Sequence, residues 1–209
     1  MYIPSHFRET DPSTVARLIR DNGFAVLVSG AGDALTATHL PMTYHPEIGS
    51  HGVLRGHVAR ANEHWRHFAA GGPALAIFSG PHAYVSPRWY QPGNSVPTWN
   101  YEAVHVYGTA RTLEDEAALR PILEALTAQY DPAWTLAALP DEYVTRMSRA
   151  IVGIEIAIDR IEAKRKLNQN RSTADIAGVA TALEVNGGDN DRMLAAAMRQ
   201  AAASRDRVP

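Results

Sequence analysis

Residues 24–42 read FAVLVSGAGDALTATHLPM, and this stretch decides the fold class. Two apolar runs, 24–29 and 35–42, flank a turn segment at 29–33 that is rich in Gly and ends on Asp. Apolar runs separated by turn-forming residues are typical of a β-hairpin. We therefore expect two antiparallel strands here.

Further β-type runs follow the hairpin, at Val53–Val58, Ala74–Ser79 and Thr98–Thr112. A late run over 154–158 places Ile at every second position, which indicates a strand with one exposed face. Early strands, inserted helices and a last strand late in the chain indicate an antiparallel α+β barrel rather than alternating βαβ units.

Helices are predicted around this barrel. A first helix should start at Pro12 with Asp11 as its cap and stop at Gly23, because Asp caps helices and Gly ends them. The others are expected over 62–70, over 114–130 and from Ser172 onward, with a break at 186–190. The expected organisation is one barrel domain over residues 1–185 and a helical C-terminal extension over 186–209.

The composition excludes several classes of function. The 209 residues contain no Cys, which removes disulfides, thiolate metal sites and cysteine nucleophiles. The formal net charge of -2 does not indicate a polyanionic partner. The N-terminus does not resemble a signal peptide and no apolar stretch reaches membrane-spanning length, so we expect a cytoplasmic protein without a membrane partner.

Three segments are candidate binding sites. Residues 80–90 and 96–101 are dense in Trp, Tyr, Gly and Pro, and their rings and amides could hold a planar ligand, although a loop fixed by its own aromatic residues fits equally well. Arg55, His57 and Arg60 lie where a strand runs into a helix, a place that suits phosphate, although solvated surface arginines are the commoner case. Residues 164–171 join basic groups to amides that could read the edge of a heterocycle, but a solvated basic loop is the commoner case.

The nine histidines do not indicate a metal site. His64 and His67 lie one helical turn apart, but no HExxH-like pattern or acidic third ligand accompanies them, so we expect surface or core histidines and no metal. The chain contains no GxSxG, P-loop or GxGxxG motif, which removes the commonest routes to a hydrolase, an NTPase or a Rossmann dehydrogenase.

Several motifs in order resemble the PaiB family of FMN-binding negative transcriptional regulators, over about residues 1–185. They are MYIPSHF (1–7), THLP (38–41), GHVARAN (56–62), GPHAYVSP (80–87), TWNY (98–101) with VH (104–105), and KLNQNR (166–171). One departure is Asn168, where the family version is expected to have Ser. The family is related to pyridoxamine-phosphate-oxidase-like split barrels, so the resemblance implies an antiparallel split β-barrel with peripheral helices, a homodimer, and FMN in the subunit interface.

Carried onto matching positions, the resemblance implies a set of cofactor-binding residues. Residues 38–41 approach the flavin, and the other groups hold its phosphate or ring edges. The full set is Thr38, His39, Leu40, Pro41, His57, Arg60, Asn62, Trp99, Asn100, Lys166, Gln169, Asn170 and Arg171.

Three functions stay open on the sequence. The regulator role and DNA binding enter only through the resemblance, and the basic segment 160–171 of a dimer is the more plausible DNA contact. The alternative is a flavin-dependent oxidoreductase or a haem-handling enzyme of the same fold. In that case His57, His82 or His105 are candidates for proton transfer, but the sequence assigns none of them as catalytic. A third is a chain that keeps the fold without FMN.

Overall fold

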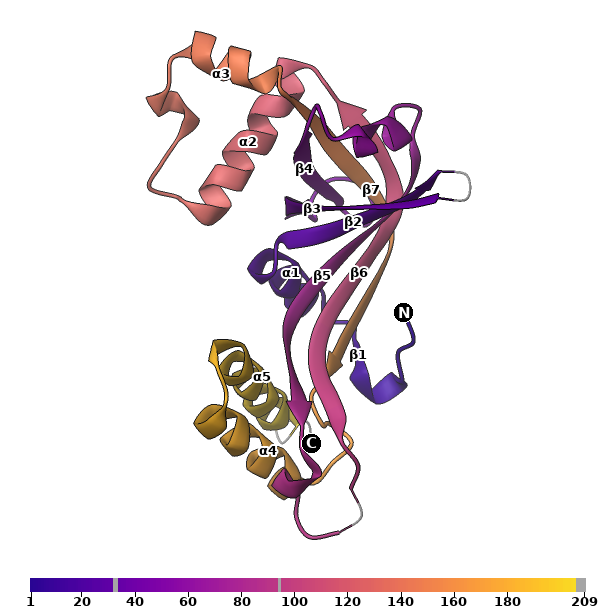
Figure 1. The fold of residues 1–209 in the computed structure, drawn as a ribbon, viewed down its shortest axis with the longest axis vertical. Coiled ribbons are helices and arrows are strands. Elements are labelled where there is room, and N and C mark those ends of the chain that lie inside the picture. The colour runs from indigo at the N-terminus through magenta and orange to yellow at the C-terminus, as the bar shows by residue number, and fades with distance from the viewer. Residues whose placement is uncertain (32–33, 94, 206–209) are drawn as a thin grey trace. The chain divides into compact units, whose positions relative to one another are not determined.

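The computed structural model describes residues 1–31, 34–93 and 95–205 and has an antiparallel α+β fold (Figure 1). Its strands are β1 (Arg8–Glu9), β2 (Phe24–Ala31), β3 (Ala34–His45), β4 (Val53–Ala59), β5 (Gly72–Val85), β6 (Thr98–Leu113) and β7 (Ile151–Lys166). Its α-helices are α1 (Pro12–Asp21), α2 (Glu116–Tyr130), α3 (Asp141–Ser148), α4 (Thr173–Asn186) and α5 (Asp189–Arg205). Short 3-10 helices are η1 (Ser5–Phe7), η2 (Glu63–Phe68), η3 (Pro87–Trp89) and η4 (Leu136–Ala138). The predicted hairpin is confirmed; Gly32 and Asp33 of its turn lie outside the described residues.

The chain forms two compact units, and each is described by itself. The barrel unit consists of Ala16–Phe78 and His105–Ile161. The helical unit consists of Met1–Val15, Ser79–Val104 and the chain from Glu162 onward. Strands β5, β6 and β7 contribute residues to both units.

The barrel unit closes on itself. Its strands pair in the order β7-β4-β3-β2-β5-β6, and β6 pairs again with β7. Gly108 on β6 packs so closely on the carbonyl oxygen of Ala157 on β7 that a Cβ would not fit between them. Alternate side chains of the strands fill the interior, and Leu27, Leu54 and Ile156 are fully buried there.

Helix α2 covers part of the outer surface of this barrel, next to β3 and β4. Its Leu119 and Ile122 pack where Gly153 leaves β7 without a side chain, since a Cβ at Gly153 would lie 3.0 and 3.1 Å from them. The predicted helix over 114–130 is therefore confirmed as a packed element. Helix α3, only eight residues long, was not predicted.

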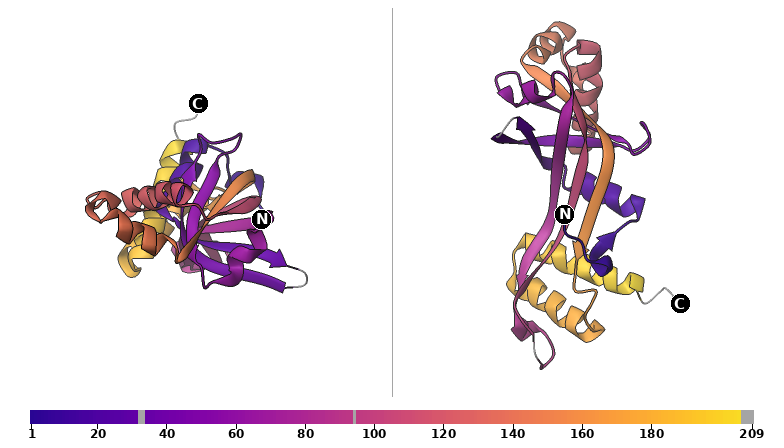
Figure 2. Two further views of the ribbon diagram at one scale, coloured as in Figure 1. Left: turned by 90° about the horizontal axis from the view of Figure 1, so that it is seen from above. Right: turned by 90° about the vertical axis from the view of Figure 1, so that its right-hand side faces the viewer.

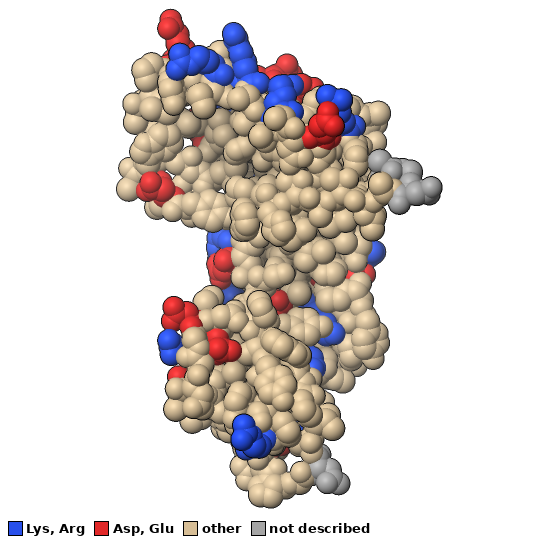
Figure 3. Space-filling model, in the orientation of Figure 1, with Lys and Arg blue, Asp and Glu red and all other residues tan. Residues whose placement is uncertain are grey.

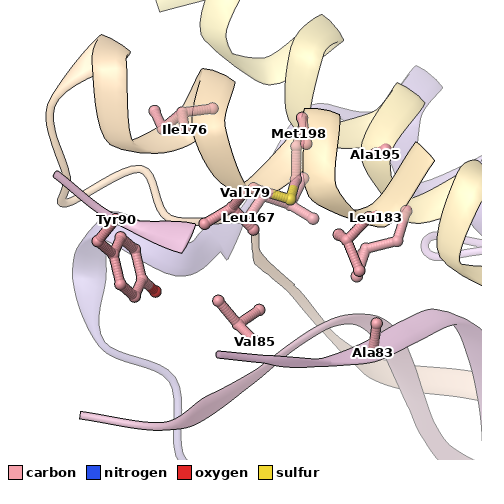
Figure 4. Close-up of a cluster of buried hydrophobic side chains, with 11 residues drawn as sticks. Ala83, Val85, Tyr90, Leu167, Ile176, Val179, Leu183, Ala195 and Met198 are labelled. Atoms are coloured by element: carbon pink, nitrogen blue, oxygen red, sulfur yellow. The ribbon is translucent and has the colours of Figure 1, made fainter. Parts of the chain in front are cut away.

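In the helical unit, α4 and α5 lie side by side (Figures 1 and 2). Their apolar faces meet Ala83 and Val85 of β5 and Leu167 in a buried cluster (Figure 4). Met198 of α5 and Val179 of α4 are fully buried at its centre. This cluster explains why the Ala-rich C-terminal segment is helical: small side chains let the two helices approach each other and the strands.

One further difference from the sequence expectation has a physical cause. Strand β5 continues to Val85 through Gly80 and Pro81, which the sequence indicated as turn formers. Pro81 lies beyond the pairing of β5 with β2, which involves Leu75–Ile77, so its missing N–H leaves that ladder intact. Among the described residues, no helix is both long enough and apolar enough to cross a membrane.

Candidate functional site

A chain of hydrogen bonds in the barrel unit links two predicted site residues to three that were not predicted. Thr38 Oγ1 accepts from Asn62 Nδ2 at 3.1 Å and lies 2.8 Å from His64 Nδ1. His64 Nε2 lies 2.8 Å from Ser29 Oγ, which lies 2.8 Å from His67 Nδ1. The structure thus brings Thr38 and Asn62 together through His64.

Local geometry holds this chain in place. Asn62 caps η2, and its Oδ1 accepts from the backbone N–H of His64 at 3.1 Å. One turn of η2 then sets His64 and His67 on the side that faces Ser29 on β2. His64 is 3% exposed, and burial, followed by the nearby His67, lowers its pKa below the ordinary value. His64 is therefore a satisfied core histidine, and among the described residues no cluster of His, Asp and Glu could hold a metal ion.

The rest of the 38–41 segment presents a different face. His39 is exposed and its ring stacks on Phe24 of β2 at a centroid distance of 6.0 Å, whereas Leu40 is 2% exposed in the interior. Pro41 lies opposite Phe24 and is half-buried. The outer face of β2, β3 and β5 is apolar, with Phe24 66% and Leu35 82% exposed. Its other members are Val26, Val28, Ala37, Leu75 and Ile77.

His57 and Arg60 lie at another part of the barrel unit. His57 projects from β4 toward α2 and α3, beside a cavity of about 170 Å³ lined mainly by Leu, Val, Ile and Met side chains. Burial lowers the pKa of His57, and its Nδ1 has no hydrogen-bond partner. Arg60 donates to the carbonyl oxygens of Arg149 and Ile151 and to the carboxylate of Glu114 at 2.6 Å. A role for Arg60 in phosphate binding stays a prediction.

A second group of predicted residues gathers in the helical unit, on β5, β6 and the end of β7. Lys166 donates to Thr98 Oγ1 and, at 2.7 Å, to the carbonyl oxygen of Trp99. Burial, followed by the charge of Lys164, lowers the pKa of Lys166. The indole of Trp99 is 55% exposed and is flanked by Tyr84 and His82, at centroid distances of 6.2 and 6.5 Å. These rings form an open aromatic surface that could contact a planar ligand.

Asn100 points the other way, into the helical unit. It is fully buried, and its Nδ2 lies 3.6 Å from Met198 Sδ. Its Oδ1 has no partner. A buried amide with an unpaired acceptor costs stability, so Asn100 is an unusual residue for a purely structural position.

The loop after β7 is organised by its own amides. Gln169 accepts from the backbone N–H of Leu167 at 2.7 Å and donates to the carbonyl of Arg165 at 2.5 Å. Asn170 is exposed, and the guanidinium of Arg171 lies 4.9 Å from the ring centre of Tyr90. Within this unit the Gln169 side chain stabilises the turn, and its role toward a ligand stays a prediction.

Asn168 has a conformational reason for its identity. Its φ is 65°, in the left-handed region, which Asn tolerates better than most residues other than Gly. Its Oδ1 also accepts from the hydroxyl of Tyr90 at 3.4 Å. Asn in place of the expected Ser therefore suits this backbone.

The basic run 164–166 is not a solvated patch. Lys164 is 6% exposed and donates to the carbonyl of Tyr2, while Arg165 binds Glu102 at 2.5 Å and Glu9 at 3.4 Å. With Lys166 also engaged, these three cations neutralise or cap groups of their own unit. They offer little free charge to a nucleic acid.

The comparisons with known proteins agree with this fold. Residues 1–160 match the family described as "Putative FMN-binding domain". Protease synthase and sporulation protein PAI 2 of Bacillus subtilis is 36% identical over 201 residues, 95% of this chain and 96% of that protein. The chain belongs to the FMN-binding family that this match describes. The PaiB resemblance found in the sequence is thereby confirmed.

Solved structures share the architecture at low identity. The FAD and heme binding protein from Mycobacterium smegmatis aligns with a TM-score of 0.61 and 19% identity, over 81% of this chain and 78% of that one. The flavocytochrome Anf3 from Azotobacter vinelandii aligns with a TM-score of 0.61 and 14% identity, over 84% and 78%. The predicted antiparallel split barrel with peripheral helices is confirmed.

Sequence reasoning missed Ser29, His64 and His67 as members of the hydrogen-bonded group around Thr38. The sequence carried one signal for Ser29: it is a polar residue at an inward-facing position of a mostly apolar strand. The role of His64 depends on contacts with Ser29 on β2 and Thr38 on β3, which lie 35 and 26 residues away in sequence. No local pattern encodes such contacts.

Proposed function

We propose that this protein is an FMN-binding split-barrel protein in which two chains pair and FMN lies at the subunit interface. The observation that carries the cofactor is membership of the FMN-binding family over residues 1–160. The chemistry of both groups is consistent with it, since Trp99 offers an exposed ring and Thr38, Asn62 and Lys166 offer hydrogen-bonding groups. When bound, FMN would supply redox chemistry, and the chain would supply binding and orientation.

The apolar outer face of β2, β3 and β5 supports pairing of two chains. Phe24 and Leu35 are large exposed apolar residues, and the strands between them add Val26 and Val28. In the view of Figure 3, few charged side chains surround this hairpin. An extended apolar face on a folded protein marks an interaction surface, and a second copy of the same face is complementary to it.

FMN titration tests the cofactor and the aromatic surface together. The fluorescence of FMN is followed as purified, flavin-free protein is added, for the unmodified chain and for Trp99→Ala. Loss of one ring contact should weaken FMN affinity by about fivefold, since an aromatic pair contributes about 1 kcal/mol. Trp134→Ala is the matched control, because Trp134 is also surface-exposed, at 39%. Equal effects of the two substitutions would remove Trp99 from the site.

The regulatory role is a proposal that rests on the relationship to the PaiB family, and the cytoplasmic location is a proposal from the sequence alone. Internal use of Lys164 and Arg165 weighs against DNA contact through the 160–171 segment. A mobility-shift assay over a range of salt concentrations decides the point. A regulator should show sequence-specific binding that weakens with salt, and equal affinity for all sequences would remove the regulatory proposal.

The alternative function, a flavin-dependent oxidoreductase, has its own test. Bound FMN is mixed with NADH or NADPH without oxygen, and the flavin absorbance is followed. Bleaching would establish electron transfer from the nucleotide to the flavin, and unchanged absorbance with both nucleotides would remove that activity.

A further inference from the structure

The chain of hydrogen bonds from His67 through Ser29 and His64 to Thr38 has a property that its individual contacts do not show. A hydroxyl donates one hydrogen bond, and a neutral imidazole donates from one nitrogen and accepts at the other. Ser29 is 4% exposed and His64 is 3% exposed, so a proton turned away from the chain would be left unpaired. The three links therefore all point in the same direction.

One direction is fixed when His67 carries a charge. Both nitrogens of a protonated imidazole donate, so His67 Nδ1 must donate to Ser29 Oγ, 2.8 Å away. Ser29 then donates to His64 Nε2, and His64 donates from Nδ1 to Thr38 Oγ1. Because Thr38 also accepts from Asn62 Nδ2, its own proton is left to donate to a third group.

The opposite direction becomes available when His67 is neutral and holds its proton on Nε2. Ser29 then donates to His67 Nδ1, His64 donates from Nε2 to Ser29, and Thr38 donates to His64 Nδ1. Thr38 now offers only a lone pair to a third group. Passing from the neutral to the charged arrangement moves one proton across each link toward His67, and the hydroxyl of Thr38 takes up one proton from solvent or from the third group, so that the net change is one proton gained by His67.

We propose that this chain of hydrogen bonds makes Thr38 a specificity-determining residue. Its hydroxyl acts as a donor or an acceptor toward a bound heterocycle according to the protonation of His67. The proposal rests on the proposed function, in which the 38–41 segment approaches FMN. The ring edge of oxidised FMN carries several acceptor atoms, so a donating Thr38 favours it.

The ionisable groups near His67 have partners of their own, so the protonation of His67 sets the direction of the hydrogen bonds. On η2, Glu63 and Arg66 pair with each other at 3.3 Å on the exposed side. The described part of β2 has no ionisable side chain, and on β3 His39 stacks on Phe24 at the outer face while His45 bonds Thr43. Burial, followed by the nearby His67, lowers the pKa of His64, which agrees with His64 staying neutral.

The first experiment examines the chain of hydrogen bonds without ligand. Nitrogen-15 NMR of histidine-labelled protein reports the tautomer of each imidazole as pH changes. We expect His64 to remain neutral and to change tautomer at the same pH at which His67 titrates. Ser29→Ala should abolish this response, and Ser50→Ala, at an exposed position, should keep it. A His64 signal that ignores His67, or that follows it equally in Ser29→Ala, overturns the proposal.

The second experiment brings in FMN. Affinity for oxidised FMN should be about fivefold tighter when His67 is charged, the effect of about one hydrogen bond. Thr38→Val should remove this difference, and comparing it with the unmodified chain cancels the titration of the FMN phosphate. The same pH dependence in Thr38→Val overturns the ligand step. Absence of FMN binding at every pH overturns the proposed function instead. The NMR result still decides whether the chain of hydrogen bonds couples His67 to His64.

Discussion

Glu155 on β7 lies directly opposite Arg55 on β4, and their side chains are joined at 2.7 and 2.8 Å. Arg111 on β6 binds the other carboxylate oxygen at 2.6 Å. Glu155 is only 6% exposed, so one buried carboxylate links the three strands at which the barrel closes. Such a group stabilises the fold only while both of its charged partners remain.

Glu155→Gln should lower the free energy of unfolding by about 2 kcal/mol, because it leaves two arginines facing a neutral amide. Urea unfolding at neutral pH measures the difference. Arg111 is 64% exposed in its side chain, so Arg111→Gln should cost less. Equal stability of Glu155→Gln and the unmodified protein would contradict the role of this carboxylate.

The same residue predicts a pH dependence. Burial raises the pKa of Glu155, but hydrogen bonds and charge from Arg111 and Arg55 outweigh it and hold the pKa below the ordinary 4.5. Since the folded-state pKa is depressed, the stabilisation is present above about pH 4.5 and is lost as the pH falls through the folded-state value. The stability difference between the unmodified protein and Glu155→Gln should therefore shrink in acid. A difference that stays constant to low pH would exclude this carboxylate as its source.

Gly178→Ala should destabilise the helical unit, although Ala is the better helix former by about 1 kcal/mol. A Cβ at Gly178 would lie 2.5 Å from the carbonyl oxygen of Trp89, so α4 and η3 would have to separate. We expect a loss of about 1–3 kcal/mol by urea unfolding. Gly188→Ala is the control, since its nearest neighbour lies 3.9 Å away. A gain in stability for Gly178→Ala would show that this packing is absent.

Asn168 should tolerate Gly better than Ala. Its φ of 65° costs a Cβ-bearing residue about 1 kcal/mol, and Gly avoids this cost. Asn168→Ala should lower the melting temperature more than Asn168→Gly, even though both remove the contact with Tyr90. The reverse order would contradict a left-handed conformation at this position.

Val26→Asp tests the pairing of two chains through the apolar face of β2. A charge on that face should convert a dimer into a monomer without loss of secondary structure, because an unpaired carboxylate is costly to bury. Sedimentation velocity and circular dichroism measure the two properties. Val185→Asp is the control, at a position 74% exposed on α4. An unmodified protein that sediments as a monomer would rule out the pairing.

Much of the barrel could be predicted because local patterns encode it. The Ile alternation over 154–158 predicted β7, and the structure buries Ile154, Ile156 and Ile158 as expected. The same pattern placed Glu155 on an exposed face, which is wrong. Its partners Arg55 and Arg111 lie 100 and 44 residues away, so no local signal could show that two cations would enclose it.

The candidate site was less predictable for the same reason. Family motifs identified Thr38, Asn62 and Lys166, but a motif does not say what each side chain contacts. The pairing of Arg60 with Glu114 and the hydrogen bonds of His64 depend on how β-strands and helices distant in sequence pack together. The domain boundary predicted after residue 185 also stays a prediction. Residues of α4 and of α5 belong to one buried cluster.

The most direct test of the central claim is sedimentation velocity of the purified protein mixed with FMN, recorded by flavin absorbance. The account predicts that flavin sediments with a species of twice the 22.8 kDa chain mass, in a ratio of one FMN to each chain. Val26→Asp should release the flavin together with the partner chain. Flavin that sediments freely beside a folded protein would contradict the claim, as would flavin bound to a single chain.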